Sequence, residues 1–244
     1  MSLGKRLITL GGAAGPTPID SGKCAVFNGT NAYVALSSTA FRYTTFSVTA
    51  WVKPDTVSSY LTVINNYESS GGAGGSPPNS GWNFRVNNNA TISMMGYSTH
   101  VSGIVTSTTT ISASIWTHIA AVITPSTWKV YINGVDGGGS GSATTTTIEY
   151  NSTGNNTCSI GRSDYVGGAS QYFDGKMDDI RVYNDELTAS EVAAIAQNNT
   201  GSIPSGNLQA YYKFDDNVND TQGNYNGVNN NVTFADDPAK VNDA

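Results

Sequence analysis

The chain has 244 residues, and its 18 acidic and 12 basic side chains give a formal net charge of −6. This acidic balance, without a cluster of Lys and Arg, argues against nucleic-acid binding, because the release of counterions from phosphates requires basic contacts. No apolar run approaches the ~20 residues that cross a bilayer, so we also expect no membrane insertion.

The first residues of the chain read MSLGKRLITLGGAAG. Lys5 and Arg6 precede an apolar run, but Leu7–Leu10 is much shorter than the ~7–15 apolar residues of a signal peptide. We therefore expect no signal peptide, and we interpret residues 1–22 as an extended arm in front of a folded domain.

Short strand-like runs follow, separated by Gly, Asn, Ser and Pro. In FSVTAWVK, at 46–53, Phe46, Val48, Ala50 and Val52 alternate with a second set of residues. This period of two is typical of a strand with two different faces. The expected strands cover residues 24–27, 33–36, 46–53, 61–65, 82–86, 91–96, 116–123, 128–132, 158–161, 175–184 and 208–214.

Two of these runs, 116–123 (WTHIAAVI) and 128–132 (WKVYI), are separated by a turn that contains proline. Asn133-Gly134 ends the second run, and this dipeptide adopts positive φ at little cost. The pattern predicts a hairpin followed by a second tight turn.

One segment has the features of a helix. Thr188 and Glu191 form a capping-box pattern, in which each side chain satisfies the backbone N–H of the other residue. Val192, Ile195 and Ala196 then share one face, which predicts a helix over about 189–197. One short helix among many strands indicates an all-β protein of two packed antiparallel sheets.

Two glycine-rich stretches, 69–80 (SSGGAGGSPPNS) and 137–142 (GGGSGS), lie between predicted strands. We interpret both as long surface loops rather than domain linkers. Because binding residues are often carried on loops of a rigid scaffold, the first stretch is a candidate ligand region.

Several motifs occur in a specific order: CAVFNGTNAYVAL at 24–36, FSVTAWVKP at 46–54, WTHIAAVI at 116–123 and WKVYINGV at 128–135. Residues 158–195 add the Ile160-Gly161-Arg162 turn, the Phe173-Asp174-Gly175 step and the capped helix. This order resembles the laminin-G-like, concanavalin A-like jelly rolls and, more distantly, the pentraxins. The resemblance covers about residues 24–195 and implies a jelly-roll sandwich of two antiparallel sheets.

The C-terminal tail, 205–244, contains a run at 208–234 that looks like the opening strand and turn of such a domain, yet here it comes last. It is either the start of a second domain or a segment that folds back to complete the sandwich. About 37 residues cannot bury a core alone. We therefore expect the tail to supply the closing strand of one domain, residues 23–244.

Most aromatic residues of the motifs are expected in the core, Trp51, Trp116 and Trp128 among them. Cys24 and Cys158 are too few for a disulfide framework. They could pair if strands bring them together, but we favour two small buried residues.

We expect no enzymatic activity and no catalytic residues. The glycosidases of this fold carry Glu-x-Asp-x-Glu or Glu-x-Asp-x-x-Glu, and this sequence contains neither run. Asp178 and Asp179 are neighbours, so on a regular strand they would point to opposite faces. His118 lies at a strand position of the family and is interpreted as structural.

Binding is the more plausible activity, because sugars are held by aromatic faces together with amide, carboxylate and guanidinium groups. The predicted ligand contacts are Tyr67, Asn79, Trp82, Arg162, Asp164 and Tyr165. The resemblance to pentraxins places a calcium site in the loops after 61–65 and after Ile160-Gly161, and this implies Asn79 and Asp164 as ligands.

A second candidate for calcium is the tail loop at 215–220 (DDNVND), through Asp216 and Asp220. Its density of oxygen atoms suits calcium, but it lacks the spacing of an EF-hand. Asx-turns explain the same residues without a metal, and we favour them.

The sequence therefore predicts a non-catalytic module that binds a glycan or another cell-surface ligand. The opening residues also look like the start of bacteriophage structural proteins that carry laminin-G-like domains. This likeness implies display on the virion surface for host attachment, with the N-terminal arm on other virion subunits. The alternatives are a capsid-decoration or fibre protein that contacts only protein, and an extracellular bacterial adhesin fragment.

Overall fold

The computed structural model describes residues 22–68, 80–97, 102–139, 147–150, 157–163, 171–199 and 201–236. Most of the predicted arm and the glycine-rich stretch 69–79 lie outside these residues. The described elements are β1 (Cys24–Asn28), β2 (Tyr33–Leu36), β3 (Phe46–Pro54), β4 (Leu61–Glu68), β5 (Ser80–Val86), β6 (Thr91–Tyr97), β7 (Ser102–Thr110), β8 (Thr117–Ile123), β9 (Trp128–Ile132), β10 (Val135–Asp136), β11 (Thr157–Ile160), β12 (Arg162–Ser163), β13 (Gln171–Tyr172), β14 (Asp174–Tyr183), α1 (Ala189–Ala196), β15 (Leu208–Tyr212), β16 (Val228–Asn230) and β17 (Thr233–Ala235).

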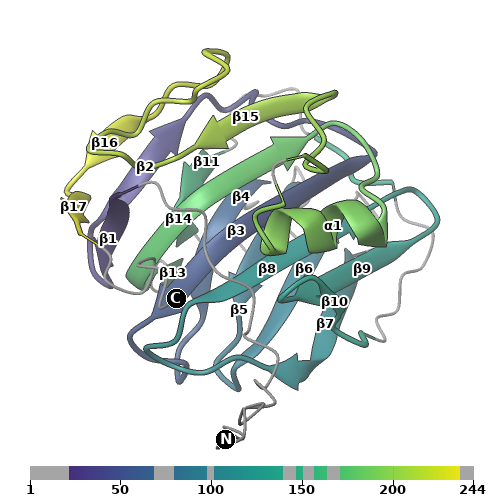
Figure 1. Cartoon of the computed structure of the whole chain (residues 1–244), viewed down its shortest axis with the longest axis horizontal. Coiled ribbons are helices and arrows are strands. Elements are labelled where there is room, and N and C mark those ends of the chain that lie inside the picture. The colour runs from purple at the N-terminus through teal and green to yellow at the C-terminus, as the bar shows by residue number, and fades with distance from the viewer. Residues whose placement is uncertain are drawn as a thin grey trace, which may run out of the picture.

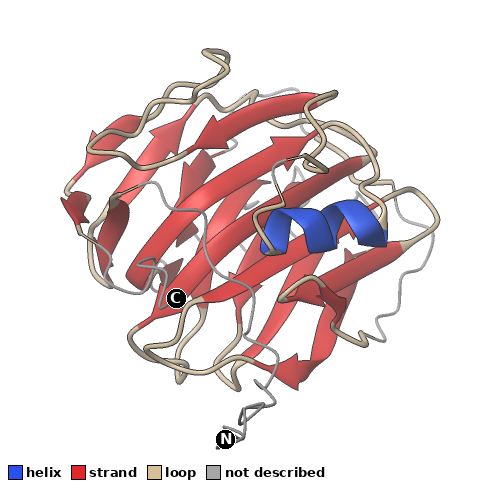
Figure 2. Ribbon diagram, viewed as in Figure 1, coloured by secondary structure: helices blue, strands red, loops and turns tan. Residues whose placement is uncertain are grey.

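The strands form two large antiparallel sheets that pack face to face (Figures 1 and 2). Sheet A has the order β10-β9-β8-β3-β14-β1-β17, with β15 also paired to β14. Sheet B has the order β16-β2-β11-β4-β5-β6-β7. The predicted all-β jelly-roll sandwich with one short helix is confirmed.

The core lies between the two sheets and follows the alternation of the strands. In β3, Phe46, Val48, Ala50 and Val52 all belong to the main buried cluster. The intervening residues, including Trp51, therefore lie on the outer face of sheet A, because successive side chains of a strand point to opposite faces.

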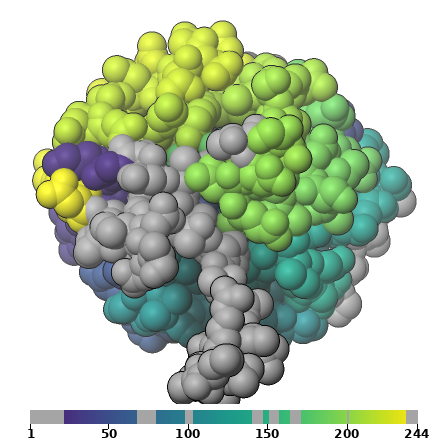
Figure 3. All heavy atoms as spheres, viewed as in Figure 1, coloured from purple at the N-terminus to yellow at the C-terminus, as the bar shows by residue number. Residues whose placement is uncertain are grey.

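The C-terminal tail joins both sheets. β15 pairs with β14, β16 pairs with β2, and β17 pairs with β1. In the space-filling view the yellow residues near the C-terminus lie against the purple residues of the first strand (Figure 3). The predicted closing strand is confirmed, and Tyr212 and Phe214 of the tail are buried in the core.

Helix α1 lies on the outer face of sheet A, as Figure 2 shows in blue. The capping box is present: Glu191 N donates to Thr188 Oγ1 at 3.2 Å, and Thr188 N donates to Glu191 Oε2 at 2.8 Å. Val192 and Ile195 pack with Val122 of β8 in a separate buried cluster. Among the described residues, no helix has the length and apolar character that a membrane span requires.

The predicted hairpin is β8–β9, and the turn after it joins β9 to β10. Asn133 and Gly134 have φ of 50° and 78°, which are the positive values expected of a type I′ turn. A Cβ at position 134 would lie 2.9 Å from Ala193 Cα. This position must therefore be glycine for α1 to pack against the turn.

A β-bulge in β14 overturns the expectation for Asp178 and Asp179. The pairing of β14 with β3 shifts between Asp178 and Arg181, and Asp179 has φ of 48°. Asp178 pairs with outward-facing Trp51, while Asp179 Oδ1 accepts a hydrogen bond from Tyr211, whose ring lies 4.0 Å from the guanidinium carbon of Arg181. The extra residue of the bulge thus puts both carboxyl groups on the outer face of sheet A.

The two cysteines form no disulfide and are buried. Cys24 packs with Trp51 and Trp116 on the outer face of sheet A, whereas Cys158 belongs to the main core. Burial raises the pKa of the Cys158 thiol. The favoured interpretation of two small buried residues is confirmed.

Candidate ligand-binding site

The predicted ligand contacts do not all lie together. Tyr67 and Arg162 lie on the outer face of sheet B, whereas Trp82 lies in the core. Asn79, Asp164 and Tyr165 lie outside the described residues, so their predicted roles are untested.

A small pocket of about 190 Å³ opens on the outer side of β2 and β11. It is smaller than the ~300–1,000 Å³ typical of pockets for drug-sized ligands, so it suits one compact group at the surface. Its described lining is Tyr33, Ala35, Leu36, Thr157, Cys158, Ser159 and Arg162.

Tyr33 and Arg162 form an aromatic and cationic part of the pocket lining, and Tyr172 lies next to them. The guanidinium carbon of Arg162 lies 4.2 Å from the centroid of the Tyr33 ring. Tyr172 pairs with Arg162 across the β12–β13 hairpin, and its ring centroid lies 6.5 Å from that of Tyr33. Stacking on Tyr33 restricts the guanidinium and presents it at the mouth of the pocket.

The position of Arg162 depends on a tight turn at Gly161. Gly161 has φ of 85°, and a Cβ there would lie 2.3 Å from the ring of Phe27. The carbonyl oxygen of Arg162 then accepts hydrogen bonds from Ser159 Oγ and from Asn65 Nδ2, both at 2.7 Å. These bonds hold the β12–β13 hairpin against β11 and β4.

Buried oxygen atoms without partners gather around this hairpin. Asn65 and Asn83 are neighbours across β4 and β5, and the Oδ1 atom of each has no hydrogen-bond partner. The same holds for Ser163 Oγ and Gln171 Oε1 in the hairpin itself. Buried polar atoms in native proteins are normally paired with protein, water or an ion. These oxygen atoms therefore suit a ligand rich in hydroxyl groups, or a hard cation.

Tyr67 lies on the outer face of sheet B, near the C-terminal end of β4. It pairs with Thr157 of β11, which lines the pocket, and its ring lies 5.0 Å from that of Tyr97. With only 2% of its surface exposed, Tyr67 presents little area to a ligand in this conformation.

Trp82, a predicted ligand contact, lies in the core and does not line the pocket. Its side chain is 0% exposed and its ring centroid lies 5.0 Å from that of Phe46 in the opposite sheet. Its indole Nε1 donates to the carbonyl oxygen of Phe41 at 3.2 Å. Trp82 pairs with Asn66 and faces the core. Asn65 and Asn83 form the adjacent pair in this register and therefore face outward.

The tail loop does not fit calcium at Asp220. Its Oδ1 accepts from the N–H groups of Tyr211 and Gln222 at 2.8 and 2.9 Å. Its Oδ2 accepts from Asn224 and Tyr225 at 3.0 and 3.1 Å. Donors thus occupy both oxygen atoms, and the bond from Gln222 N to Oδ1 has the spacing of the Asx-turn that we favour. Asp216 is exposed and lies 3.9 Å from Lys23 Nζ, so it is not brought into a site with Asp220.

The two segments that the pentraxin resemblance assigns to calcium do meet, because Asn65 donates to the carbonyl of Arg162. There the described residues provide amide and hydroxyl oxygen atoms, which calcium accepts as ligands. No described carboxylate lines the pocket. Across the described part of the chain, no three His, Cys, Asp or Glu side chains gather where they could hold a metal.

Two titratable groups with large pKa shifts, His118 and Asp179, lie on the opposite sheet. Burial, together with the charge of Arg181, lowers the pKa of His118 to about 3, so its ring is neutral at pH 7. Burial raises the pKa of Asp179 to about 6, against the opposing effects of Arg181 and Tyr211. Both groups lie on the outer face of sheet A and take no part in the pocket.

Sequence reasoning missed Tyr33, Asn65, Asn83, Ser159 and Tyr172. A signal was available for the two asparagines, because each stands at an outward position among the apolar residues of its strand. Tyr33 and Tyr172 carried no such signal, since an aromatic residue in a strand fits the core equally well.

The family model described as the concanavalin A-like lectin/glucanases superfamily matches residues 28–193. No curated protein matches the chain in sequence. Among solved structures, a Bacteroides ovatus protein whose name proposes carbohydrate binding is similar, with a TM-score of 0.65 and 18% identity over 91% of this chain. The present chain covers 60% of that protein's length.

Two further structures share the fold. The heptameric SAP-like pentraxin of Limulus polyphemus has a TM-score of 0.55 and 15% identity, over 93% of this chain and 95% of its own. The CBM40 of the Ruminococcus gnavus IT-sialidase, solved with α2,3-sialyllactose, has a TM-score of 0.53 and 13% identity, over 70% of this chain and 96% of its own.

Proposed function

Because the chain belongs to the concanavalin A-like lectin/glucanases superfamily, we propose that it is a non-catalytic module that binds a glycan on the outer face of sheet B. The proposal depends on one observation, the stacked Tyr33 and Arg162 in the lining of a pocket beside the β12–β13 hairpin, around which buried oxygen atoms gather. The Bacteroides ovatus protein and the sialyllactose-bound module, both named as carbohydrate-binding, share the fold.

The chemistry of the face matches the two sides of a sugar. The C–H surface of a pyranose packs on an aromatic ring, while its hydroxyl groups need hydrogen-bond acceptors and donors. Tyr33 and Tyr172 offer rings, Asn65 and Asn83 offer acceptors, and Arg162 offers N–H donors and a positive charge. The ligand we favour is therefore a glycan whose terminal sugar reaches the pocket.

Calcium is the proposed cofactor, at the β12–β13 hairpin. The buried oxygen atoms of Asn65, Ser163 and Gln171 support it. A carboxylate would have to come from Asp164, and Asn79 is the other ligand that the pentraxin resemblance implies.

A glycan array, run with calcium and with a chelator, tests both proposals. We expect binding in calcium and weaker binding in the chelator. Replacing Tyr33 with alanine should weaken binding about tenfold or more, equivalent to roughly 1.4 kcal/mol, because the ring and the orientation of Arg162 are both lost. Binding constants come from titration of the best glycan on the array.

Tyr60 is the matched control. Its ring stacks on Arg85, with 4.3 Å from the guanidinium carbon to the centroid, and it lies away from the pocket. Tyr60→Ala should leave binding unchanged. An array without any bound glycan, or equal losses for the two tyrosine variants, would refute glycan binding at this pocket.

We further propose that the module is displayed on a virion surface, on the likeness of Met1–Gly15 to phage structural proteins. Antibody labelling of purified particles should then place the chain on their exterior. A chain that is found on particles but binds no glycan would favour the capsid-decoration or fibre role instead.

A further inference from the structure

Strand β16, which belongs to the C-terminal tail, lies along the edge of sheet B next to the pocket. It pairs with β2 (Figure 1), and Val228 is directly opposite Ala35 in this register. Asn230 is directly opposite Tyr33. Ala35 and Tyr33 both line the pocket. Because opposite residues of paired strands share a face, Val228 and Asn230 lie on the same side of the sheet as the pocket.

Val228 ends a cross-strand row that starts inside the pocket. Ala35 also pairs with Ser159 of β11, so Ser159, Ala35 and Val228 lie in line across three neighbouring strands. Two strand spacings separate the ends of this row, a distance of ~10 Å. At its β11 end, Ser159 Oγ donates to the carbonyl oxygen of Arg162 at 2.7 Å, so the β12–β13 hairpin closes the row there. At the other end Val228 is 65% exposed. A ligand that fills the pocket can therefore continue toward β16.

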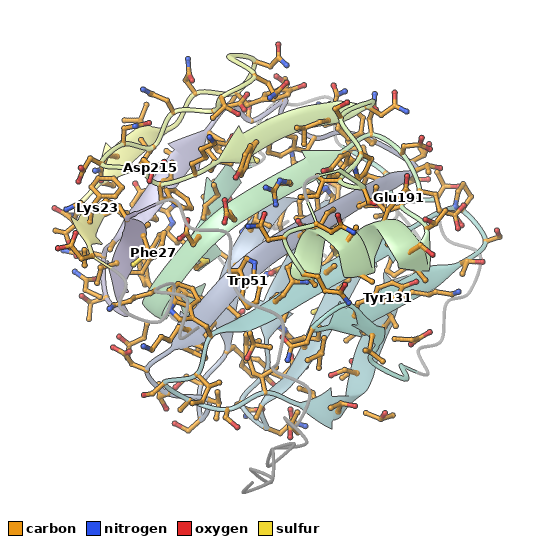
Figure 4. All side chains as sticks on the ribbon, in the orientation of Figure 1. Lys23, Phe27, Trp51, Tyr131, Glu191 and Asp215 are labelled. Atoms are coloured by element: carbon orange, nitrogen blue, oxygen red, sulfur yellow. The ribbon has the colours of Figure 1, made fainter. Side chains whose placement is uncertain are left out.

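The backbone on either side of Val228 is held by contacts of described residues. Gly227 directly precedes it, and a Cβ there would lie 2.2 Å from Val34 Cγ1, so only glycine lets the chain lie this close to β2. Further along the tail, β17 pairs with β1. Lys23, which Figure 4 shows at this edge of the sandwich, forms an ion pair with Asp236 at 2.9 Å. The tail thus presents Val228 beside the pocket without rearrangement.

A single exposed valine is ordinary on a protein surface, but this one lies in line with two residues of the pocket lining. We propose that Val228 and Asn230 form a second subsite, so that the module binds an oligosaccharide of at least two sugar units. This inference rests on the proposed glycan binding. One sugar occupies the pocket, and the next packs its C–H surface on Val228. Asn230 Nδ2 donates to the Val228 carbonyl oxygen at 3.0 Å, and its Oδ1 accepts from the hydroxyl groups of the second sugar.

Two methyl glycosides prepared from the glycan that the array binds best test the second subsite in the full chain: its terminal monosaccharide and its terminal disaccharide. We expect the disaccharide to bind at least about fivefold more tightly, the order of one added apolar contact. Val228→Ser should remove this preference and leave the affinity for the monosaccharide within twofold. Val228→Ile keeps the apolar contact and should retain the preference. Isothermal titration calorimetry, with competition against the disaccharide for the weaker probe, gives the affinities.

Val135 provides the matched control, because it is 69% exposed and lies on β10, at the edge of sheet A. Val135→Ser should change neither affinity, and neither serine variant should alter the thermal unfolding curve. Equal affinities of the unmodified protein for the two probes would overturn the second subsite. An unchanged preference in Val228→Ser, or an equal loss for both probes, would do the same. In these cases Tyr33→Ala still weakens binding. If Tyr33→Ala has no effect, or no glycan binds, the proposed function fails and the second subsite fails with it.

Discussion

Replacing Asp220 with alanine is expected to lower the free energy of unfolding by about 3–5 kcal/mol, because four buried or half-buried backbone N–H groups lose a charged acceptor at once. These N–H groups belong to β15 and to the loop that follows it. The carboxylate therefore fastens the closing strand of sheet A to the turn that leads into β16. Urea unfolding, followed by far-ultraviolet circular dichroism, measures the change.

Asp216 provides the control, since its carboxylate is exposed and makes only a long ion pair with Lys23. Asp216→Asn should change the stability by less than about 0.5 kcal/mol, because asparagine also tolerates the positive φ of 58° at this position. The effect of Asp220→Ala should be the same in calcium and in chelator, because the carboxylate acts on N–H groups and not on a metal. A loss of stability that appears only in calcium would restore Asp220 as a metal ligand.

Replacing Trp82 with alanine should cost about 3–5 kcal/mol, because the indole fills the space between the sheets beside Phe46. Loss of glycan binding by this variant would follow from unfolding and would not indicate a ligand contact. Thermal unfolding monitored by circular dichroism measures the loss of stability.

Trp82→Phe separates the two explanations. This variant keeps an aromatic ring in the core but removes the hydrogen bond from Nε1 to the Phe41 carbonyl. We expect a smaller loss of stability and glycan affinity within twofold of the original. A folded Trp82→Phe protein of normal stability that fails to bind would instead mean that the indole contacts the ligand.

The two faces of the sandwich thus have different chemistry. Sheet B presents a pocket with rings, a guanidinium and oxygen acceptors, and we assign ligand binding to it. Sheet A carries α1 on its outer face, where Val192 and Ile195 pack on Val122 of β8. Surface substitutions meant to alter binding are therefore best placed on β2, β11 and the β12–β13 hairpin.

Much of the fold could be predicted from local patterns. The alternation in β3, the Asn133-Gly134 turn and the Thr188–Glu191 capping box each depend on residues within one turn or strand. Such signals survive in any tertiary context, because the hydrogen bonds or side-chain directions that they describe are made locally. The motif order then implied how the strands are arranged, including a tail that closes the sandwich.

The binding residues could be predicted only in part. Arg162 could be predicted because it follows a recognisable Ile-Gly-Arg turn. Only glycine fits at position 161, because a Cβ there would overlap the ring of Phe27. Trp82 was misplaced because strands β4 and β5 carry apolar and polar residues on both faces. A shift of one residue in such a strand exchanges its two faces, and only the pairing of the strands decides between them.

The sequence by itself determined that this chain is an all-β sandwich with one capped helix and no glycosidase motif, because these features rest on short-range patterns. Only the tertiary structure decided that Tyr33 and Arg162, which are far apart in the chain, meet at one pocket, and that N–H donors occupy the carboxylate of Asp220. The physical reason is the same in each case: long-range strand pairing sets which side chains share a face, and residues near in sequence carry little information about that pairing.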